Sequence, residues 1–426
     1  MNLIKSLLIR VLRLLRVRRP VPDTYLIPAY AGLGNFIMAT PMVLELKRRR
    51  PGARIFLLTW PSYGTDQVFD APEVDVGCWM LDAGLENQQQ LAESRHSSPG
   101  SHPAFKIQNS KSPSVSGIFL LDPGAPLWRK ILFFLRLRAW RFRMGLILFD
   151  ACPPFVWWGF ALAGIGRLFG HSMEAMGIPD AWPQRVLDGI VPVSVGSHET
   201  AIHLDLLDRA VPPLDPHSPR DYATHMAAGG EEIVRAFGLN PGAYIVVQLS
   251  AANARFRTPK LWDRQRWAEV IRALEAKGET IVLPGDENEK PLVDEFVRCQ
   301  GLSKAVNLAG RTSVREISTV IKYAKLLLVH DSGLMHIGNA HGTSLIALYG
   351  PTDWNFTMPK AATSRILRKN LECQPCMARM AKTEQEAMRD CKVDVQCMRD
   401  ITVEDVLKAV GEGGGQREGG ILDFEF

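Results

Sequence analysis

The run Val329–His336 (VHDSGLMH) combines residue types that bind phosphate. An apolar stretch ends at His330 and Asp331, and a polar turn then leads into a helical pattern. The first N–H groups of a helix are unsatisfied and carry partial positive charge, so they attract phosphate oxygens. Ser332 can cap such a helix or donate to phosphate, and Gly333 lets the backbone approach a ligand. Taken alone, the turn fits a plain helix cap equally well.

Two further turns follow apolar stretches in the same way. Tyr349–Asp353 (YGPTD) predicts a sharp polar turn at the carboxyl end of a strand. Tyr30–Gly34 (YAGLG) is a glycine loop between an apolar stretch and a helical pattern. Ligands of open α/β sheets bind beyond the carboxyl ends of the strands. We therefore expect one binding cleft, with Gly32, Gly34 and Gly333 on its walls.

The elements that position these turns alternate along the chain, which is typical of α/β folds with parallel sheets. The sequence predicts strands at 24–29, 54–59, 144–149, 244–249, 280–283, 325–329 and 344–349. It predicts helices at 35–50, 267–277, 314–323 and 332–341.

The length of 426 residues bounds the chain at roughly two domains, each with its own core. A proline-rich segment at 210–217 predicts a linker between them. We expect an N-terminal domain over 21–215, with an irregular insertion at about 85–123 that is rich in Gln, Ser, Pro and Gly. A second domain is expected over 216–410, and the glycine-rich residues 411–426 are expected to form a flexible tail.

Residues 1–20 contain no acidic residue and separate leucines from arginines on a helical wheel. This pattern predicts a basic amphipathic helix on an anionic membrane surface, with packing against the protein's own body as the alternative. Residues 144–170 are too interrupted by Asp, Pro and Arg to span a bilayer. The absence of a signal-peptide pattern favours a cytoplasmic protein at the inner face of the cytoplasmic membrane. A net charge of +5 and the lack of a nucleic-acid motif argue against a nucleic-acid partner.

Basic residues alternate with Leu, Phe and Trp over 129–143, just before an aromatic cluster at 155–160. Core packing is the favoured explanation for the aromatic cluster, because aromatic side chains dominate protein cores. A lipid-facing patch near the N-terminal helix is the alternative. A solvated helix face would explain the basic residues.

Two sequence blocks resemble glycosyltransferase family 9, the ADP-heptose:lipopolysaccharide heptosyltransferases. The first covers 32–55 (GLGNFIMATPMVLELKRRRPGARI), and the second, more specific block covers 330–353 (HDSGLMHIGNAHGTSLIALYGPTD). RTPKLWDRQRW and LPGDENE lie between them in the family's order. The resemblance extends over about Tyr25 to Val410. It implies an α/β protein with the GT-B fold, two Rossmann-like domains facing across a cleft, and metal-independent transfer with inversion at the sugar carbon.

By position, the resemblance implies that Lys260 binds the leaving diphosphate and takes part in catalysis, a role that suits a single cation beside developing negative charge. Glu289 stands where the family places an acid on the ribose, although the preceding turn differs in length. Ser250, Asn253 and Arg255 follow the strand at 244–249 and are expected to add phosphate contacts. The donor-binding positions expected are Gly32, Gly34, Ser250, Asn253, Glu289, Asp331, Ser332, Gly333, Leu334 and His336.

One departure from the family concerns the first glycine loop, where the expected catalytic base is an aspartate. This chain has Asn35 there, and a neutral amide cannot accept a proton as a carboxylate does. Asn35 can still orient an acceptor hydroxyl. One explanation is that another carboxylate replaces the aspartate, with Asp66, Asp150 and Glu45 as candidates. The other two explanations are catalysis by positioning and leaving-group stabilisation alone, and loss of catalysis.

Four cysteines lie close together in the C-terminal part of the chain, at Cys373, Cys376, Cys391 and Cys397. Four thiolates can form a closed structural zinc site, but the second spacing exceeds the usual zinc pattern. Two disulfides and four reduced thiols are the alternatives. The cysteines at 78, 152 and 299 are isolated and are expected in the core.

The sequence as a whole predicts a glycosyltransferase that uses ADP-heptose and needs no cofactor. Its partners would be this nucleotide sugar and a lipopolysaccharide-core or other lipid-linked acceptor. Transfer from another nucleotide sugar in surface polysaccharide synthesis is one alternative, because a fold does not choose its sugar. A catalytically idle sugar-nucleotide-binding protein and a GT-B epimerase are the others.

Overall fold

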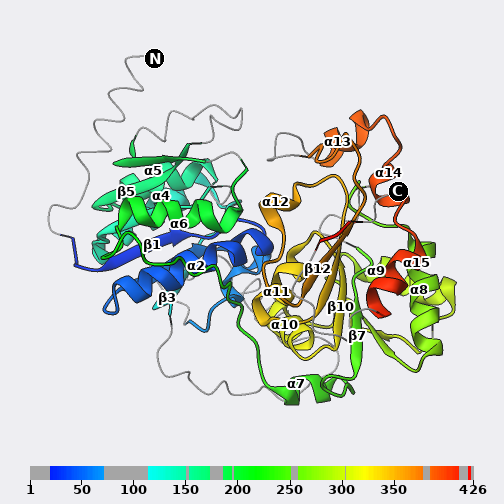
Figure 1. The fold of residues 1–426 in the computed structure, drawn as a ribbon. Helices are drawn as coiled ribbons and strands as arrows, with labels where there is room; N and C mark the ends of the chain where they lie inside the picture. Colours follow the sequence, from blue (N-terminus) through cyan, green and yellow to red (C-terminus); the bar gives the residue numbers. More distant parts are fainter. Residues whose placement is uncertain are drawn as a thin grey trace.

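The computed structural model describes residues 20–71, 114–149, 153–172, 186–193, 196–250, 258–302, 304–377, 384–411 and 421–423. They form two parallel β-sheets of six and seven strands, each covered by helices. Figure 1 shows the two sheets side by side, with α7 near the segment that joins them. The predicted basic helix at 1–20 lies, apart from Pro20, outside the described residues.

The N-terminal sheet has the strand order β3-β2-β1-β4-β5-β6, and every neighbouring pair is parallel. Its strands are β1 (Thr24–Pro28), β2 (Arg54–Thr59), β3 (Gly117–Leu120), β4 (Met144–Ile147), β5 (Arg167–Ser172) and β6 (Gly189–Pro192). Its helices are α2 (Leu33–Arg49), α4 (Leu127–Leu137), α5 (Pro154–Leu162) and α6 (Glu199–Ala210). Short 3-10 helices occupy Pro61–Tyr63, Thr65–Gln67 and Arg138–Trp140.

The C-terminal sheet has the order β13-β12-β11-β10-β7-β8-β9 and is also parallel. Its strands are β7 (Tyr244–Val247), β8 (Thr280–Leu283), β9 (Val306–Asn307), β10 (Leu326–His330), β11 (Leu345–Tyr349), β12 (Ser364–Arg368) and β13 (Ile421–Asp423). The longer helices are α8 (Arg264–Ala276), α9 (Lys290–Gln300), α10 (Val314–Lys322), α11 (Gly333–His341) and α15 (Val403–Gly411). The shorter helices are α7 (Glu231–Ala236), α12 (Trp354–Thr357), α13 (Glu384–Asp390) and α14 (Gln396–Arg399).

Both sheets reverse their strand order at one point, between β1 and β4 and between β7 and β10. Doubly wound sheets bind ligands at such points, beyond the carboxyl ends of the strands. The predicted class of two facing Rossmann-like sheets is confirmed. The boundary that we expected near residue 215 falls between α6 and α7.

Two segments differ from the sequence expectations. Residues 117–120, within the segment expected to be irregular, form β3 because the apolar run GIFL pairs with the edge strand β2. Residues 421–423, expected to be part of a flexible tail, form β13 because ILD pairs with β12 beyond the glycine-rich run. Local composition hid both strands, since each is short and lies beside residues typical of loops.

Three apolar clusters hold the layers together. One runs through the inner layer of both sheets and includes residues of α2, α6, α10 and α11. A second lies between the N-terminal sheet and α4 and α5, and contains the aromatic cluster at 155–160, partly buried at Trp157 and Trp158. A third lies between the C-terminal sheet and α8 and α15. No helix within the described residues is both long enough and apolar enough to cross a bilayer.

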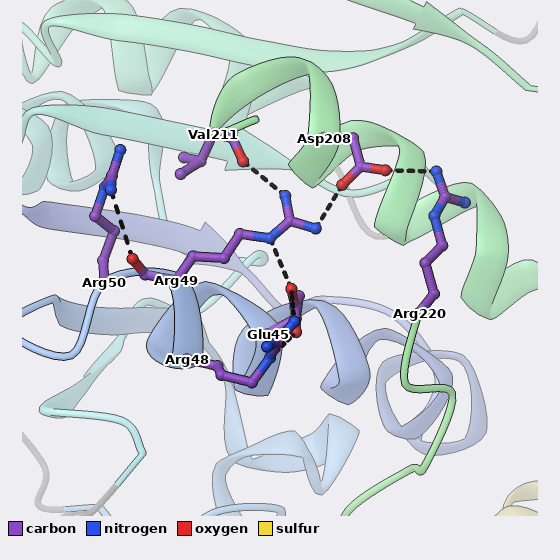
Figure 2. A network of polar contacts seen from close by, with 7 residues as sticks. All are labelled: Glu45, Arg48, Arg49, Arg50, Asp208, Val211 and Arg220. Atoms are coloured by element: carbon purple, nitrogen blue, oxygen red, sulfur yellow. Dashed lines mark hydrogen bonds and ion pairs between the residues drawn. The ribbon is translucent and has the colours of Figure 1, made fainter. Parts of the chain in front are cut away.

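Helices α2 and α6 pack side by side, and ion pairs connect the C-terminal turns of the two helices (Figure 2). The buried Arg49 guanidinium donates to Glu45 Oε1 at 2.7 Å and to Asp208 Oδ1 at 2.6 Å. It also donates to the Val211 carbonyl oxygen at 2.7 Å, and Arg220 pairs with the other Asp208 oxygen. This network fixes the two helices relative to each other, so their amino ends share one wall of the cleft between the sheets.

Candidate functional site

A cleft of about 710 Å³ lies between the two sheets, and segments from both of them line it. The N-terminal sheet contributes the loop after β1, the 3-10 turn after β2 and the start of α6. The C-terminal sheet contributes the segments that follow β7, β8, β9, β10 and β11. The predicted residues that line this cleft are Gly32, Gly34, Asn35, Lys260, Glu289, Asp331, Ser332, Gly333, Leu334 and His336.

The amino end of α11 faces the cleft. Ser332 is the residue before the helix, but its hydroxyl makes no capping bond to it. The hydroxyl instead donates to the Gln248 side-chain oxygen at 2.7 Å, which ties α11 to the end of β7. Helix N–H groups without a side-chain cap are available to an anion. This arrangement keeps the amino end of α11 open toward the cleft.

The two sheets approach each other most closely where α2 meets α11. A Cβ atom on Gly34 would lie 2.7 Å from His336 Cδ2 and 3.3 Å from Gly333 Cα. The lack of a side chain at Gly34 therefore brings the two helix starts together. Both glycine turns predicted from the sequence meet here.

His336 is buried in this contact, and its imidazole stays neutral. Its pKa is lowered to about 4, mainly by burial, while the Asp331 charge opposes this decrease and the Lys260 charge adds to it. The Lys260 and Asp331 side chains thus both lie close enough to the ring to influence its charge. Because the imidazole is neutral, it adds no positive charge to the cleft, whereas Lys260 does.

The segment that carries Lys260 is held to the C-terminal sheet by its neighbour Trp262. The Trp262 backbone N–H donates to His330 Nε2 at 3.0 Å, and its indole N–H donates to the Ile401 carbonyl oxygen at 2.9 Å. Burial lowers the pKa of His330 to about 3, so the ring remains a neutral acceptor. The Trp267 ring packs edge-on against both Trp262 and His330. Lys260 therefore extends from a rigid base.

Glu289 also lines the cleft. Its Oε2 accepts a hydrogen bond of 2.8 Å from the Asp286 backbone N–H. Burial raises the pKa of the Glu289 carboxyl, while the Asp286 backbone and the Ser250 hydroxyl counteract this rise. Ser250 is itself buried, so it supports Glu289 from within the protein. Asn253 and Arg255 lie outside the described residues.

Glu199, which the sequence analysis did not identify, lies beside Asn35. It begins α6, is fully buried from bulk solvent and lines the cleft. Burial raises its carboxyl pKa well above 4.5, the Asp331 charge adds to the rise, and the adjacent Asn35 side chain opposes it. Glu199 Oε1 lies 3.6 Å from His203 Nε2. A carboxyl group therefore stands next to the amide that occupies the expected position of the base.

The sequence signal at Glu199 was ambiguous, because an acidic residue in the first turn of a helix is ordinary helix-dipole chemistry. Of the carboxylates that we considered instead, the two that the structure describes do not line the cleft. Glu45 is bound to Arg48 and Arg49 near the far end of α2, and Asp66 lies in the 3-10 turn after β2. Asp150 lies outside the described residues.

The four C-terminal cysteines are free thiols. Cys397 is buried, and burial raises the pKa of its thiol to about 12, with smaller contributions from Cys376, Cys373 and Cys391. Among the described residues, which include all four, no group of three or more metal-ligating side chains is arranged to hold an ion. Cys299, expected in the core, is exposed on α9.

Residues 218–387 match the model of glycosyltransferase family 9 (heptosyltransferase). The chain is 25% identical to lipooligosaccharide heptosyltransferase 2 of Campylobacter jejuni over 179 residues, which are 41% of this chain and 50% of that protein. It is 31% identical to lipopolysaccharide heptosyltransferase 2 of Escherichia coli K12 over 118 residues, 27% of this chain and 34% of that one. The chain thus matches half or less of the length of these relatives.

Solved structures extend the likeness in fold to both sheets. The structure of E. coli ADP-heptose lps heptosyltransferase II aligns with a TM-score of 0.63 at 18% identity, covering 92% of this chain and 98% of that one. E. coli heptosyltransferase WaaC with ADP aligns with a TM-score of 0.60 at 15% identity, covering 92% and 100%. At this identity the likeness establishes the fold, which is GT-B as predicted.

Proposed function

We propose that the chain is a member of glycosyltransferase family 9, whose model matches residues 218–387, and that it transfers heptose from ADP-heptose to a lipopolysaccharide core or a related envelope glycolipid. The similar protein WaaC has been solved with ADP and with ADP-2-deoxy-2-fluoro heptose, which supports an ADP-sugar as the donor. We further propose that the enzyme works at the inner face of the cytoplasmic membrane, where a lipid-linked acceptor is accessible.

One observation carries the proposal: the uncapped amino end of α11 and the side chain of Lys260 line one cleft. Helix N–H groups bind a diphosphate, and a cation beside them stabilises the charge that develops as the diphosphate leaves. In the proposed mechanism these groups provide the stabilisation, so no metal ion is required. Glu289, which lines the same cleft, would accept a hydrogen bond from the ribose.

We propose Glu199 as the general base. The oxygen of the acceptor hydroxyl forms a bond to the anomeric carbon of the donor, and its proton moves to the Glu199 carboxylate. The bond from this carbon to the diphosphate oxygen breaks, and the nucleoside diphosphate leaves with the electron pair toward Lys260. Attack opposite the leaving group inverts the configuration. Asn35 would orient the acceptor hydroxyl.

Calorimetric titration with ADP, UDP, GDP and dTDP tests the donor class. We expect selective binding of ADP, and transfer of heptose when ADP-heptose and an acceptor are supplied, without loss of rate in EDTA. Lys260→Ala should lower turnover with little effect on folding, because the side chain is only partly buried. Unchanged turnover in this variant would contradict the proposed role of Lys260 in stabilising the leaving diphosphate. If the protein preferred another nucleotide, the proposal of heptose as the donor sugar would be wrong, but the proposal of a glycosyltransferase would stand.

Asn35 supports a second candidate, an idle nucleotide-sugar-binding protein. This candidate predicts ADP binding without any product. Mass spectrometry of the acceptor after incubation with ADP-heptose separates the two, because only the enzyme adds the mass of a heptose. A changed donor in the absence of acceptor would instead indicate an epimerase.

A further inference from the structure

Helix α4 exposes an unusual amount of apolar surface. Nine large hydrophobic side chains are exposed among the described residues, and five of them lie on this helix. Leu127 and Trp128 are 62% and 60% exposed. The set on α4 is Leu127, Trp128, Ile131, Leu132 and Leu135. Their spacing places them on one face of the helix, so α4 carries a continuous apolar face toward solvent.

The opposite face of α4 is firmly packed, which fixes the direction of the exposed face. Phe133, Phe134 and Leu137 are buried. The Phe134 ring covers Gly159 of α5 so closely that a Cβ atom there would lie 2.2 Å from Phe134 Cε2. Helix α4 therefore cannot roll to bury its apolar residues on the N-terminal sheet. The position of α4 beside α5 is visible in Figure 1.

The charged residues of the segment that carries α4 are all basic. Between Asp122 and Asp150 the chain has no acidic residue, but it has six basic ones. These are Arg129, Lys130, Arg136, Arg138, Arg141 and Arg143. Arg141 and Arg143 are exposed, and the Arg129 guanidinium lies over the Trp128 ring at 5.2 Å. Aromatic and basic side chains together suit the headgroup region of an anionic bilayer.

We propose that the exposed face of α4 docks on an anionic lipid surface. The apolar side chains would enter the boundary between headgroups and acyl chains, while the flanking arginines bind lipid phosphates. A second copy of the chain would bring two strongly basic surfaces together, which electrostatic repulsion opposes. The purpose of docking rests on the proposed function, since it would hold the N-terminal sheet beside a lipid-linked acceptor.

Vesicle sedimentation of the full chain tests the proposal. Vesicles of phosphatidylcholine are compared with vesicles that also contain phosphatidylglycerol, and we expect binding to require the anionic lipid. The double variant Trp128→Ser, Leu135→Ser should partition at least about tenfold more weakly, because two large side chains no longer enter the bilayer. The matched control, Ile190→Ser with Leu214→Ser, removes two exposed apolar side chains elsewhere and should bind as the wild type does.

A second experiment tests the role of charge with two double variants, each of which removes two positive charges. Arg129→Gln with Arg143→Gln alters the segment around α4, and Lys277→Gln with Lys304→Gln alters the C-terminal half. Only the first pair should weaken binding, and added salt should reduce this difference. ADP binding measured in parallel should be unchanged in all variants, so a failure of docking is separate from a failure of the proposed function. Equal partition of wild type and the Trp128 variant would overturn the proposal. So would wild-type self-association that the same variant abolishes without any vesicle binding.

Discussion

Asn35 and Glu199 lie side by side at the amino ends of α2 and α6, on the wall of the cleft opposite the amino end of α11. The amide alone cannot accept a proton, and the carboxyl beside it can. The cleft therefore retains a carboxyl group beside Asn35, although this group comes from a different helix than the family pattern implies. This relationship gives the proposed reaction a base that the sequence alone did not reveal.

Glu199→Gln should lower kcat about 100- to 10,000-fold, the usual contribution of a general base, with little change in donor KM. Because burial raises the pKa of Glu199, wild-type kcat should rise with pH as the carboxyl ionises. The glutamine variant should lose this rise. The exposed Glu269→Gln on α8 is the control and should match the wild type. A variant that keeps both its kcat and its pH profile would exclude Glu199 as the base.

The same substitution should stabilise the protein at high pH. A carboxyl whose pKa is raised on folding contributes stability that is complete below its unfolded pKa near 4.5 and lost as pH rises through the folded value. Glutamine has no such penalty. We expect Glu199→Gln to unfold at higher urea concentration than the wild type at pH 8, with a difference that shrinks toward pH 4.5. A difference independent of pH would indicate a packing effect.

Arg49→Met should destabilise the fold and also slow the reaction. The substitution removes three hydrogen bonds of a buried guanidinium, one of them to the Asp208 carboxylate of α6 (Figure 2). The loss should be about 1.5–3 kcal/mol in the free energy of unfolding. Because the network aligns α2 with α6, kcat should fall as well, but less than in Glu199→Gln.

The control for this change is Arg50→Met, one residue along the chain. Its guanidinium is exposed and makes a long contact of 3.5 Å with the Arg49 carbonyl oxygen. Urea unfolding should show a difference of at most about 0.5 kcal/mol from the wild type. If both variants lost equal stability, the Arg49 network would not be the cause.

Six histidines should make the protein labile to acid. Burial lowers the pKa of His171, His203 and His330 to about 3, and that of His198, His336 and His341 to about 4. In the unfolded chain these rings take up protons near pH 6.5, whereas in the folded protein they stay neutral. Their contribution to the free energy of unfolding is therefore fully present above pH 6.5 and is lost as the pH falls. Each adds a slope of up to about 1.4 kcal/mol per pH unit.

Urea unfolding between pH 7 and pH 5 measures this slope. His341→Gln should reduce this slope by the amount that corresponds to one proton taken up on unfolding. The fold should persist, since glutamine can keep the hydrogen bond that His341 makes to the Ser318 hydroxyl. The exposed His217→Gln is the control and should leave the slope unchanged. A stability independent of pH over this range would contradict the prediction.

The sequence predicted those parts of the site that depend on local pattern. A buried strand that ends in a polar glycine turn predicts a helix start, so the position of Ser332 and Gly333 at the amino end of α11 could be predicted without a fold. Lys260 was recognisable because two tryptophans at fixed spacing follow it. Strands β3 and β13 were not recognisable from the sequence, because their pairing partners are distant along the chain and their sequence neighbours resemble loops.

Glu199 could not be predicted for a related reason. Its proximity to Asn35 arises from the packing of α6 on α2, which the sequence does not encode in any spacing between the two residues. Its raised pKa likewise comes from burial by residues of both sheets. The same holds for the apolar face of α4, because the pattern shows that the helix is amphipathic but not which of its faces α5 covers.

Gly34→Ala should impair both the fold and the reaction, because it separates the two helix starts. The new Cβ atom would lie 2.7 Å from His336 Cδ2, so α2 and α11 must move apart. We expect a cost of about 1–3 kcal/mol in the free energy of unfolding and a fall of about 100-fold in kcat/KM, since small displacements of reacting groups are costly. Gly52→Ala, where a Cβ atom would meet no neighbour within 4 Å, is the control.

The double variant Gly34→Ala, His336→Ala distinguishes steric conflict from other effects of the added methyl group. Removing the imidazole makes room for the methyl, so stability should recover relative to Gly34→Ala alone. Activity should stay low, because His336 also lines the cleft near Lys260 and Asp331. If stability did not recover, contact with the imidazole would not be why this position requires glycine.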